Sequence, residues 1–179
     1  MSTEQATLAV RVADLRRAFD ESFARKPPEL SADERNFLAL RQGPERYAIR
    51  LEDVAGLFAD KTVVPFRSRL PELLGIAGIR GSLVPVFSLG QLLGYPRPTT
   101  TPRWLFVSAR SAVAFAFDEL DGYLRAPSSA IAEAREEASG EKRGEMLVLS
   151  NVNRVIVGLQ SFIDDIANRA GIVDARKEP

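Results

Sequence analysis

The stretch ELLGIAGIRGSLVPVFSLGQLLGY, Glu72 to Tyr95, decides the fold. Two runs of strand-forming residues flank the pair Arg80-Gly81, and the second run carries Pro85 and then a leucine-rich turn. Gly81 suits a tight turn between strands, because such turns commonly need a positive φ angle. Pro85 predicts a strand edge or bulge, where its missing N–H costs no ladder hydrogen bond. We therefore expect a hairpin that turns at Gly81. Arg80 stands next to this turn and has no such structural duty.

Similar signals recur on both sides of this stretch. Short runs rich in β-branched and aromatic residues are separated by turn residues about every 8–12 positions, which favours small antiparallel barrels or a sandwich over βαβ units. We also expect helical turns at 70–74 and 91–94 and a short amphipathic helix over 162–170. The expected strands are residues 37–40, 47–51, 62–65, 83–89, 104–108, 112–117, 146–149 and 154–159.

The first 25 residues form a different kind of segment. Apolar residues at spacings of three and four predict an amphipathic helix, which Pro27 and Pro28 end. The apolar stripe either packs on the same chain or fits a partner's groove, and the mixed charges of the other faces argue against a membrane surface. We divide the chain into this helix and its hinge (1–30), a β-rich domain (36–170) and a polar tail (171–179). The stripe consists of Leu8, Val12, Leu15, Phe19 and Phe23.

Composition excludes several classes of protein. Twenty-four basic residues balance 24 acidic ones, so the net charge of zero gives no support for nucleic-acid binding. Trp104 and Phe106 lie in apolar strand runs, and Arg67, Arg69 and Arg103 are too scattered to predict a basic groove. The chain has no cysteine and no histidine, which removes disulfides, thiolate nucleophiles, imidazole bases and most zinc sites.

Membrane insertion and secretion are also not expected. No apolar run reaches the roughly 20 residues that cross a bilayer, and the N-terminus lacks the basic start and apolar core of a secretory signal. We therefore expect a cytoplasmic protein.

Paired carboxylates are the main argument for an enzyme. Asp118-Glu119 could act in general acid–base chemistry if one carboxyl were buried, but adjacent residues of a strand point to opposite faces. Asp164-Asp165 lies on the surface of an expected helix. There is no phosphate-binding loop and no G-x-G-x-x-G motif. The residues thus favour a binding protein without catalytic residues, cofactor or metal.

The segment from Leu74 to Gly81, followed by Val84-Pro85-Val86 and Leu89, resembles the signature region of CheW-like domains, the coupling proteins of bacterial chemosensory arrays. The resemblance covers roughly 36–165, with a hairpin at 45–51, a Phe-Asp-Glu-Leu segment at 117–120 and a closing hairpin and helix in matching order. It implies an all-β fold of two SH3-like five-stranded barrels that share a core, with a groove between them. The implied role is to bridge a CheA-type histidine kinase and the cytoplasmic tip of a chemoreceptor (a methyl-accepting protein), at membrane-associated arrays.

The resemblance also implies site residues. The arginine that matches Arg80 is associated with receptor contact in this family. Val54 and Leu57 match positions near the receptor-facing groove, although apolar residues there are equally well explained as barrel core.

Three positions depart from the family pattern and indicate a divergent member. Gly56 stands where related proteins carry an acidic residue, Gly78 where they often carry asparagine, and Ser88 where they often carry aspartate. Loss of a carboxylate at position 56 would remove one possible ion pair with a partner. The alternative is therefore a regulator that binds only receptor or only kinase, or a new partner through the N-terminal helix.

Overall fold

The computed structural model describes residues 33–100, 102–133 and 144–170. The described residues from Glu34 onward form one compact unit, to which all the described strands and helices belong. The predicted apolar stripe of the N-terminal helix lies outside the described residues and stays a prediction. It consists of Leu8, Val12, Leu15, Phe19 and Phe23.

The first sheet forms a barrel from both ends of this unit. Its strand order is β10-β11-β12-β2-β1-β9, and β12 runs parallel to β2. The two edge strands, β9 and β10, are separated only by the 3₁₀ turn η2 (Ser128–Ala130), so they form one bent segment whose two ends pair with opposite edges of the sheet. The sheet thereby closes. Its strands are β1 (Glu34–Gln42), β2 (Glu45–Arg50), β9 (Glu119–Pro127), β10 (Ile131–Glu133), β11 (Glu145–Leu149) and β12 (Val152–Ile156).

The second sheet closes in the same way. Its order is β3-β7-β8-β6-β5-β4, and only residues 60–62 separate its edge strands β3 and β4. Six strand segments per sheet therefore correspond to five passes of the chain, which reconciles the six-stranded sheets with the two five-stranded barrels that the resemblance implies. The strands are β3 (Val54–Ala59), β4 (Val63–Val64), β5 (Leu73–Ile79), β6 (Ser82–Ser88), β7 (Trp104–Ser108) and β8 (Ala114–Phe117).

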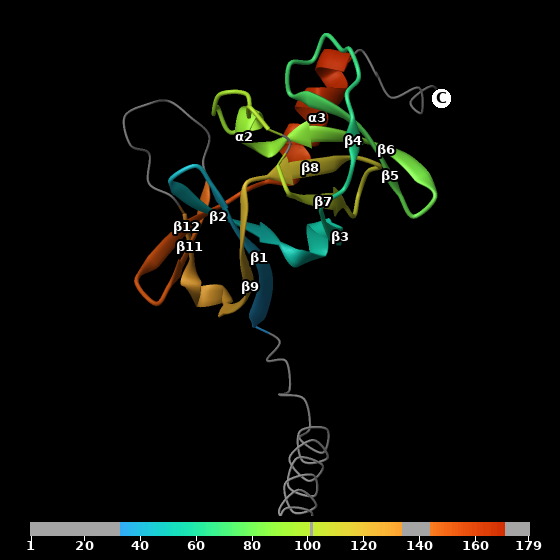
Figure 1. Ribbon diagram of the computed structural model, residues 1–179. Coiled ribbons are helices and arrows are strands. Elements are labelled where there is room, and N and C mark those ends of the chain that lie inside the picture. The colour runs from blue at the N-terminus through green and yellow to red at the C-terminus, as the bar shows by residue number, and fades with distance from the viewer. Residues whose placement is uncertain (1–32, 101, 134–143, 171–179) are drawn as a thin grey trace, which may run out of the picture. The chain divides into compact units, whose positions relative to one another are not determined.

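The second barrel is inserted into the first. The chain leaves the first barrel after β2, passes through the 3₁₀ turn η1 (Leu51–Asp53), builds the whole second barrel and returns from β8 to β9 (Figure 1). A helical turn, α2 (Leu89–Leu92), follows β6, and α3 (Leu159–Ala170) follows β12. The short C-terminal helix predicted over 162–170 is thus confirmed and begins three residues earlier.

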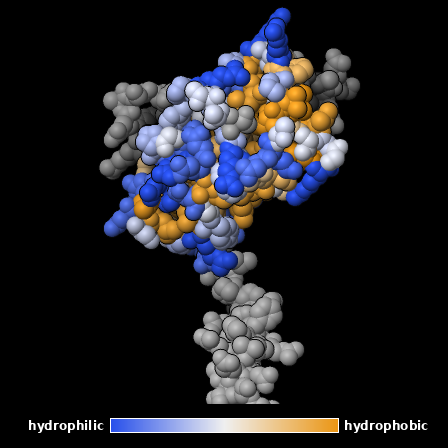
Figure 2. All heavy atoms as spheres, viewed as in Figure 1, coloured by the Kyte–Doolittle hydropathy of each residue, from blue (hydrophilic) through white to orange (hydrophobic). Residues whose placement is uncertain are grey.

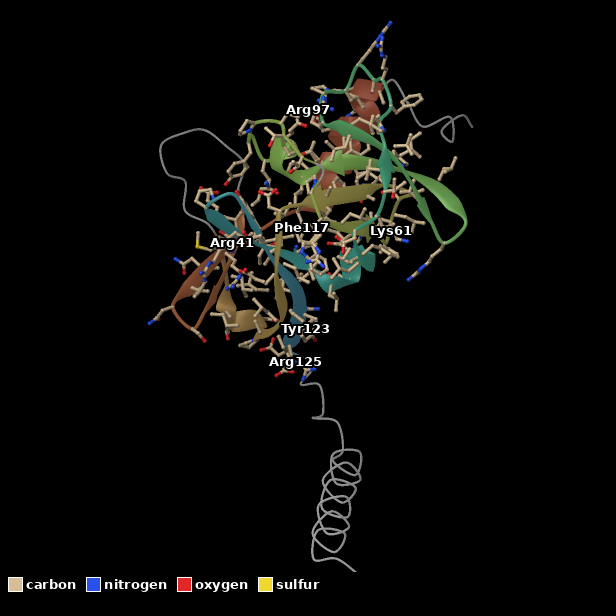
Figure 3. The ribbon with its side chains drawn as sticks, viewed as in Figure 1. Arg41, Lys61, Arg97, Phe117, Tyr123 and Arg125 are labelled. Carbon is tan, nitrogen blue, oxygen red and sulfur yellow. The ribbon has the colours of Figure 1, made fainter. Side chains whose placement is uncertain are left out.

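Three apolar cores hold this arrangement together. Strand β8 shows how, because Phe115 and Phe117 face a core shared by the two sheets, whereas Ala114 and Ala116 face the core of the second barrel. Phe117 lies in the middle of the described unit, between the two sheets (Figure 3). A third core, which includes Phe37, is built from residues of β1, β2, β9, β11 and β12 of the first sheet. Helix α3 covers the shared core with Leu159 and Ile166.

The helical turn expected over 70–74 is wrong. Only one backbone hydrogen bond, from Leu73 N to Leu70 O (3.2 Å), closes a turn there, and β5 begins at Leu73. The reason is tertiary packing. Strand β4 lies so close to β5 that a Cβ atom at Gly75 would lie 2.1 Å from the carbonyl oxygen of Val64. Pairing of β5 with β4 and β6 therefore overrides the helical preference of residues 73 and 74.

Candidate partner-binding site around Arg80

Arg80 is one of the two residues that make the β5–β6 turn. Ile79 pairs with Ser82, so Arg80 and Gly81 alone connect the strands, with φ angles of 49° and 82°. Positive φ at both central residues defines a type I′ turn. Sequence analysis placed Arg80 next to the turn, and the structure places it within. Left-handed backbone costs a residue with a side chain roughly 1–2 kcal/mol, and strained positions of this kind cluster at functional sites.

The guanidinium of Arg80 lies over an aromatic ring of β3. Its Cζ atom is 5.7 Å from the ring centroid of Phe58, and the Nζ atom of Lys61 is 5.6 Å from the same centroid. Both distances are those of cation–π contacts. Phe58 is half-buried and packs against the core of the second barrel, and this packing restricts the orientation of its ring. We call Arg80, Phe58 and Lys61 the Arg80 cluster.

The two cations of the Arg80 cluster have no acidic partner in the part of the chain that the structure describes. The acid nearest in sequence, Asp60, pairs instead with Arg103, at 3.1 Å. The charge of the cluster is therefore available to another molecule.

Gly56 makes room for the ring of Phe58. A Cβ atom at position 56 would lie 3.0 Å from Cε2 of Phe58 and 3.4 Å from Nη2 of Arg80, so the ring would have to shift. Glycine at this position thus has a physical consequence. It leaves room for an aromatic ring that supports the arginine.

Val54 and Leu57 lie on β3 but pack against a different core. Both are half-buried and contact the shared core, whereas Phe58 contacts the second-barrel core. The structure therefore places Val54 and Leu57 against the shared core and does not bring them to the ring of Phe58; their role in receptor contact stays a prediction. Sequence reasoning missed Phe58 and Lys61, because β3 and β5 are not neighbours in the strand order and only closure of the barrel brings them near each other.

A second feature of the same hairpin is an apolar outer face. Val64 on β4 pairs with Ile76 on β5, and Ile76 pairs with Pro85 on β6, so the three side chains share one face. Leu83 lies farther along this face, with 79% of its surface exposed, and Val64 is 63% exposed. Figure 2 shows apolar side chains gathered over β4, β5 and β6. We call Val64, Ile76, Leu83 and Pro85 the apolar strand face; exposed patches of this kind mark interaction sites.

The other two positions that the resemblance singled out, Ser88 and Gly78, have different surroundings. Ser88 is buried and caps α2, because its Oγ accepts a hydrogen bond from Gln91 N at 3.3 Å; serine and aspartate serve equally well at such a position. Gly78 is exposed opposite Leu83, and no atom lies within 4 Å of where its Cβ would be. The glycine therefore leaves Leu83 uncovered.

The carboxylates considered for catalysis have structural partners. Asp118 accepts hydrogen bonds from Gln42 Nε2 (2.6 Å) and from Gly43 N (3.2 Å), which fastens the β1–β2 turn. Glu119 pairs with Arg41. Among the described residues, no group of acidic side chains could hold a metal ion, and no helix is long and apolar enough to cross a membrane.

The ionisable groups with shifted pKa values lie away from the Arg80 cluster. The hydroxyl of Tyr47 donates to Glu45 Oε2 at 2.6 Å and lies 3.1 Å from the hydroxyl of Tyr95. The hydrogen bond from Tyr47 lowers the pKa of Glu45, and burial raises the pKa of Tyr47 and, less strongly, that of Tyr95. This cluster ties β2 to the segment after α2 and stabilises the fold.

Comparison with known proteins agrees with this architecture. Residues 36–159 match the family model of the CheW-like domain. The scaffolding protein TtCheW of Thermoanaerobacter tengcongensis has a similar structure, with a TM-score of 0.61 and 13% sequence identity over 69% of this chain and 88% of that one. A search of curated proteins gives no match. The chain therefore belongs to the CheW-like domain family, whose members are non-catalytic scaffold proteins of chemotaxis signalling.

Proposed function

We propose that this chain is a coupling adaptor that joins a CheA-type histidine kinase to the cytoplasmic tip of a chemoreceptor. The observation that carries the proposal is the position of Arg80. Its backbone is left-handed in a two-residue turn, where glycine or asparagine would fit at lower cost, and its side chain is supported by Phe58. The left-handed backbone of Arg80 costs stability, and its charge has no acidic partner among the described residues. Binding of another protein by this charge would explain why arginine occupies the position.

The Arg80 cluster supports contact with the receptor through carboxylates or carbonyl oxygens. A guanidinium donates parallel hydrogen bonds to a carboxylate, and such charge-assisted bonds are about twice as strong as neutral ones. Phe58 limits the positions that the guanidinium can take, which lowers the entropy lost on binding. Lys61 adds a second positive charge beside the same ring.

The apolar strand face supports contact with the kinase. It is built on paired strands and so has a fixed shape, and its most exposed member, Leu83, lies three residues after Arg80. Burial of an apolar side chain of this size stabilises a complex by about 1.5–3 kcal/mol. One hairpin would then carry both surfaces: a charged tip for the receptor and an apolar side for the kinase.

Titration calorimetry with the separate partners tests the proposal. The full chain should bind the isolated receptor tip and the isolated kinase of its own host, and each should still bind when the other is already present. Binding of only one of them would support the alternative, a regulator restricted to receptor or kinase. Binding of neither would refute the proposal.

A further inference from the structure

A hollow of about 580 Å³ lies beside the loop that connects β4 to β5. Arg67 on this loop and Arg97, which follows α2, contribute to its wall; Leu70 and Leu73 also line it. Figure 3 shows Arg97 on the opposite side of Phe117 from Tyr123 and Arg125. We call this the basic hollow. It is separate from the Arg80 cluster, which involves none of its lining residues.

Among the described residues, the basic hollow carries positive charge without a neutralising acid. None of the described residues that line it is acidic, and Arg67 and Arg97 form no ion pair with any described residue; the same is true of exposed Arg69 on the loop. The one acid of the loop, Glu72, binds Arg169 at 2.6 Å. Two other hollows mix both signs: the one at Arg50 is also lined by glutamates, and one that Arg97 also borders is lined by Asp118 and Glu119.

Prolines and hydrogen bonds restrict the backbone that carries these arginines. Arg97 lies between Pro96 and Pro98. Each proline has a fixed φ angle, and Pro98 disfavours helical backbone at Arg97, the residue before it. The loop begins at Pro65 and contains Pro71, and Ser68 Oγ accepts a hydrogen bond from Leu70 N at 3.0 Å. A partner would therefore meet charges whose backbone is already ordered, which reduces the cost of binding.

Apolar surface lies next to the charges. Leu70 and Leu73 are half-buried and pack against the shared core, whereas Phe66 on the same loop is 59% exposed and also lines the hollow. A free anion would use the arginines alone. A peptide with both acidic and apolar side chains would use the arginines and Phe66 together.

We propose that the basic hollow binds an acidic linear segment of a partner protein. Carboxylates of the segment pair with Arg67 and Arg97, which match carboxylate geometry through their planar donors. An apolar side chain of the segment covers Phe66 and the exposed parts of Leu70 and Leu73. Phe66 follows Val64 of the apolar strand face by two residues, so the segment can belong to a protein that also covers that face. The inference does not depend on which partner that is.

Fluorescence anisotropy with a labelled synthetic peptide tests this proposal. The peptide is rich in glutamate around a central leucine, and the full-length protein is titrated at low and at physiological salt. The double variant Arg67→Gln/Arg97→Gln should bind it about tenfold more weakly or worse. The control Arg35→Gln/Arg46→Gln removes the same charge from two exposed arginines of the first barrel that also lack described ion pairs, and should change affinity less than twofold.

Further measurements distinguish an acidic peptide from other ligands of the basic hollow. Phe66→Ser keeps every charge and should weaken peptide binding severalfold, and a peptide with serine in place of leucine should bind equally weakly to the wild type. Equal losses in the control variant would refute a specific site. Full competition by inorganic phosphate with no effect of Phe66→Ser would show an anion site instead, and binding to phosphatidylserine vesicles but not to the peptide would show a lipid surface. Circular dichroism and urea unfolding confirm that each variant is folded.

Discussion

Replacing Arg80 with asparagine separates the two contributions of this residue, its backbone in the turn and its charged side chain. Asparagine adopts left-handed backbone readily, and Asn-Gly is the preferred pair of a type I′ turn. The change Arg80→Asn therefore keeps or improves the turn while it removes the guanidinium from the ring of Phe58.

The two effects on stability nearly cancel. The relief of left-handed strain is worth up to about 1 kcal/mol of the roughly 1–2 kcal/mol that a bulky residue costs there. The lost cation–π contact costs about 0.5–1 kcal/mol at an exposed site. We expect the free energy of unfolding to stay within about 1 kcal/mol of wild type. Receptor binding loses charge-assisted hydrogen bonds worth about 1.5–3 kcal/mol, so the dissociation constant should rise about 10- to 150-fold.

Urea unfolding measures the stability term, and titration calorimetry with the receptor tip measures the binding term. Arg46→Asn is the matched control, because Arg46 is exposed on β2 and has no ion pair with a described residue. It should leave receptor affinity unchanged. Destabilisation of Arg80→Asn by more than about 2 kcal/mol would show that Arg80 holds the turn together. Unchanged receptor affinity in a folded variant would refute its role in binding.

Three neighbouring features give further predictions. Phe58→Leu keeps apolar contact with the second-barrel core but removes the ring beneath Arg80, so receptor affinity should fall about two- to fivefold in calorimetry. Leu83→Ser should weaken kinase binding about tenfold or more without unfolding the protein, because this side chain is 79% exposed before binding. Tyr47→Phe removes the hydrogen bond that lowers the pKa of Glu45 from 4.5. A carboxylate with a lowered pKa stabilises the fold above pH 4.5, and this stabilisation disappears as the pH falls. The variant should therefore lose stability less steeply than wild type below pH 4.5 in urea unfolding at a series of pH values.

Each of these changes has a control within the chain. Tyr123→Leu alters an exposed ring of β9, in the first barrel and outside the Arg80 cluster, and should leave receptor affinity unchanged. Val148→Ser alters an exposed apolar residue of β11, in the first barrel, and should leave kinase affinity unchanged. Glu45→Gln removes the titrating group, so an acid limb as steep as that of wild type in this variant would contradict the assignment to Glu45.

Local turn chemistry made the hairpins predictable. The turn at Gly81 follows from a residue that favours positive φ, and in the last hairpin Asn151 favours the same backbone, with φ of 50° at Ser150 and 62° at Asn151. Strand β9 was not predicted, because Glu119–Pro127 contains acidic residues, Gly122 and proline and has no buried run. It is a strand because β1 pairs with it, and that partner lies far away in the sequence.

The candidate site was predictable only in part for the same reason. Arg80 could be chosen from the sequence because its neighbours had structural duties and it had none. Phe58 and Lys61 could not, since their relation to Arg80 depends on closure of the second barrel. Val54 and Leu57 show the converse problem: an apolar pattern does not tell which of two cores a strand faces, and only the structure shows that they contact the shared core.

The insertion of one barrel into the other governs how this domain can fold. Leu38 of β1 pairs with Tyr123 of β9, so the first barrel cannot close until the ribosome has delivered the entire second barrel. Contacts this distant in sequence slow folding, and until they form the free edge of β1 can pair with the wrong strand. We expect the second barrel to acquire structure first during synthesis. Fragments cut between the barrels, after β2 or after β8, should not yield two folded halves.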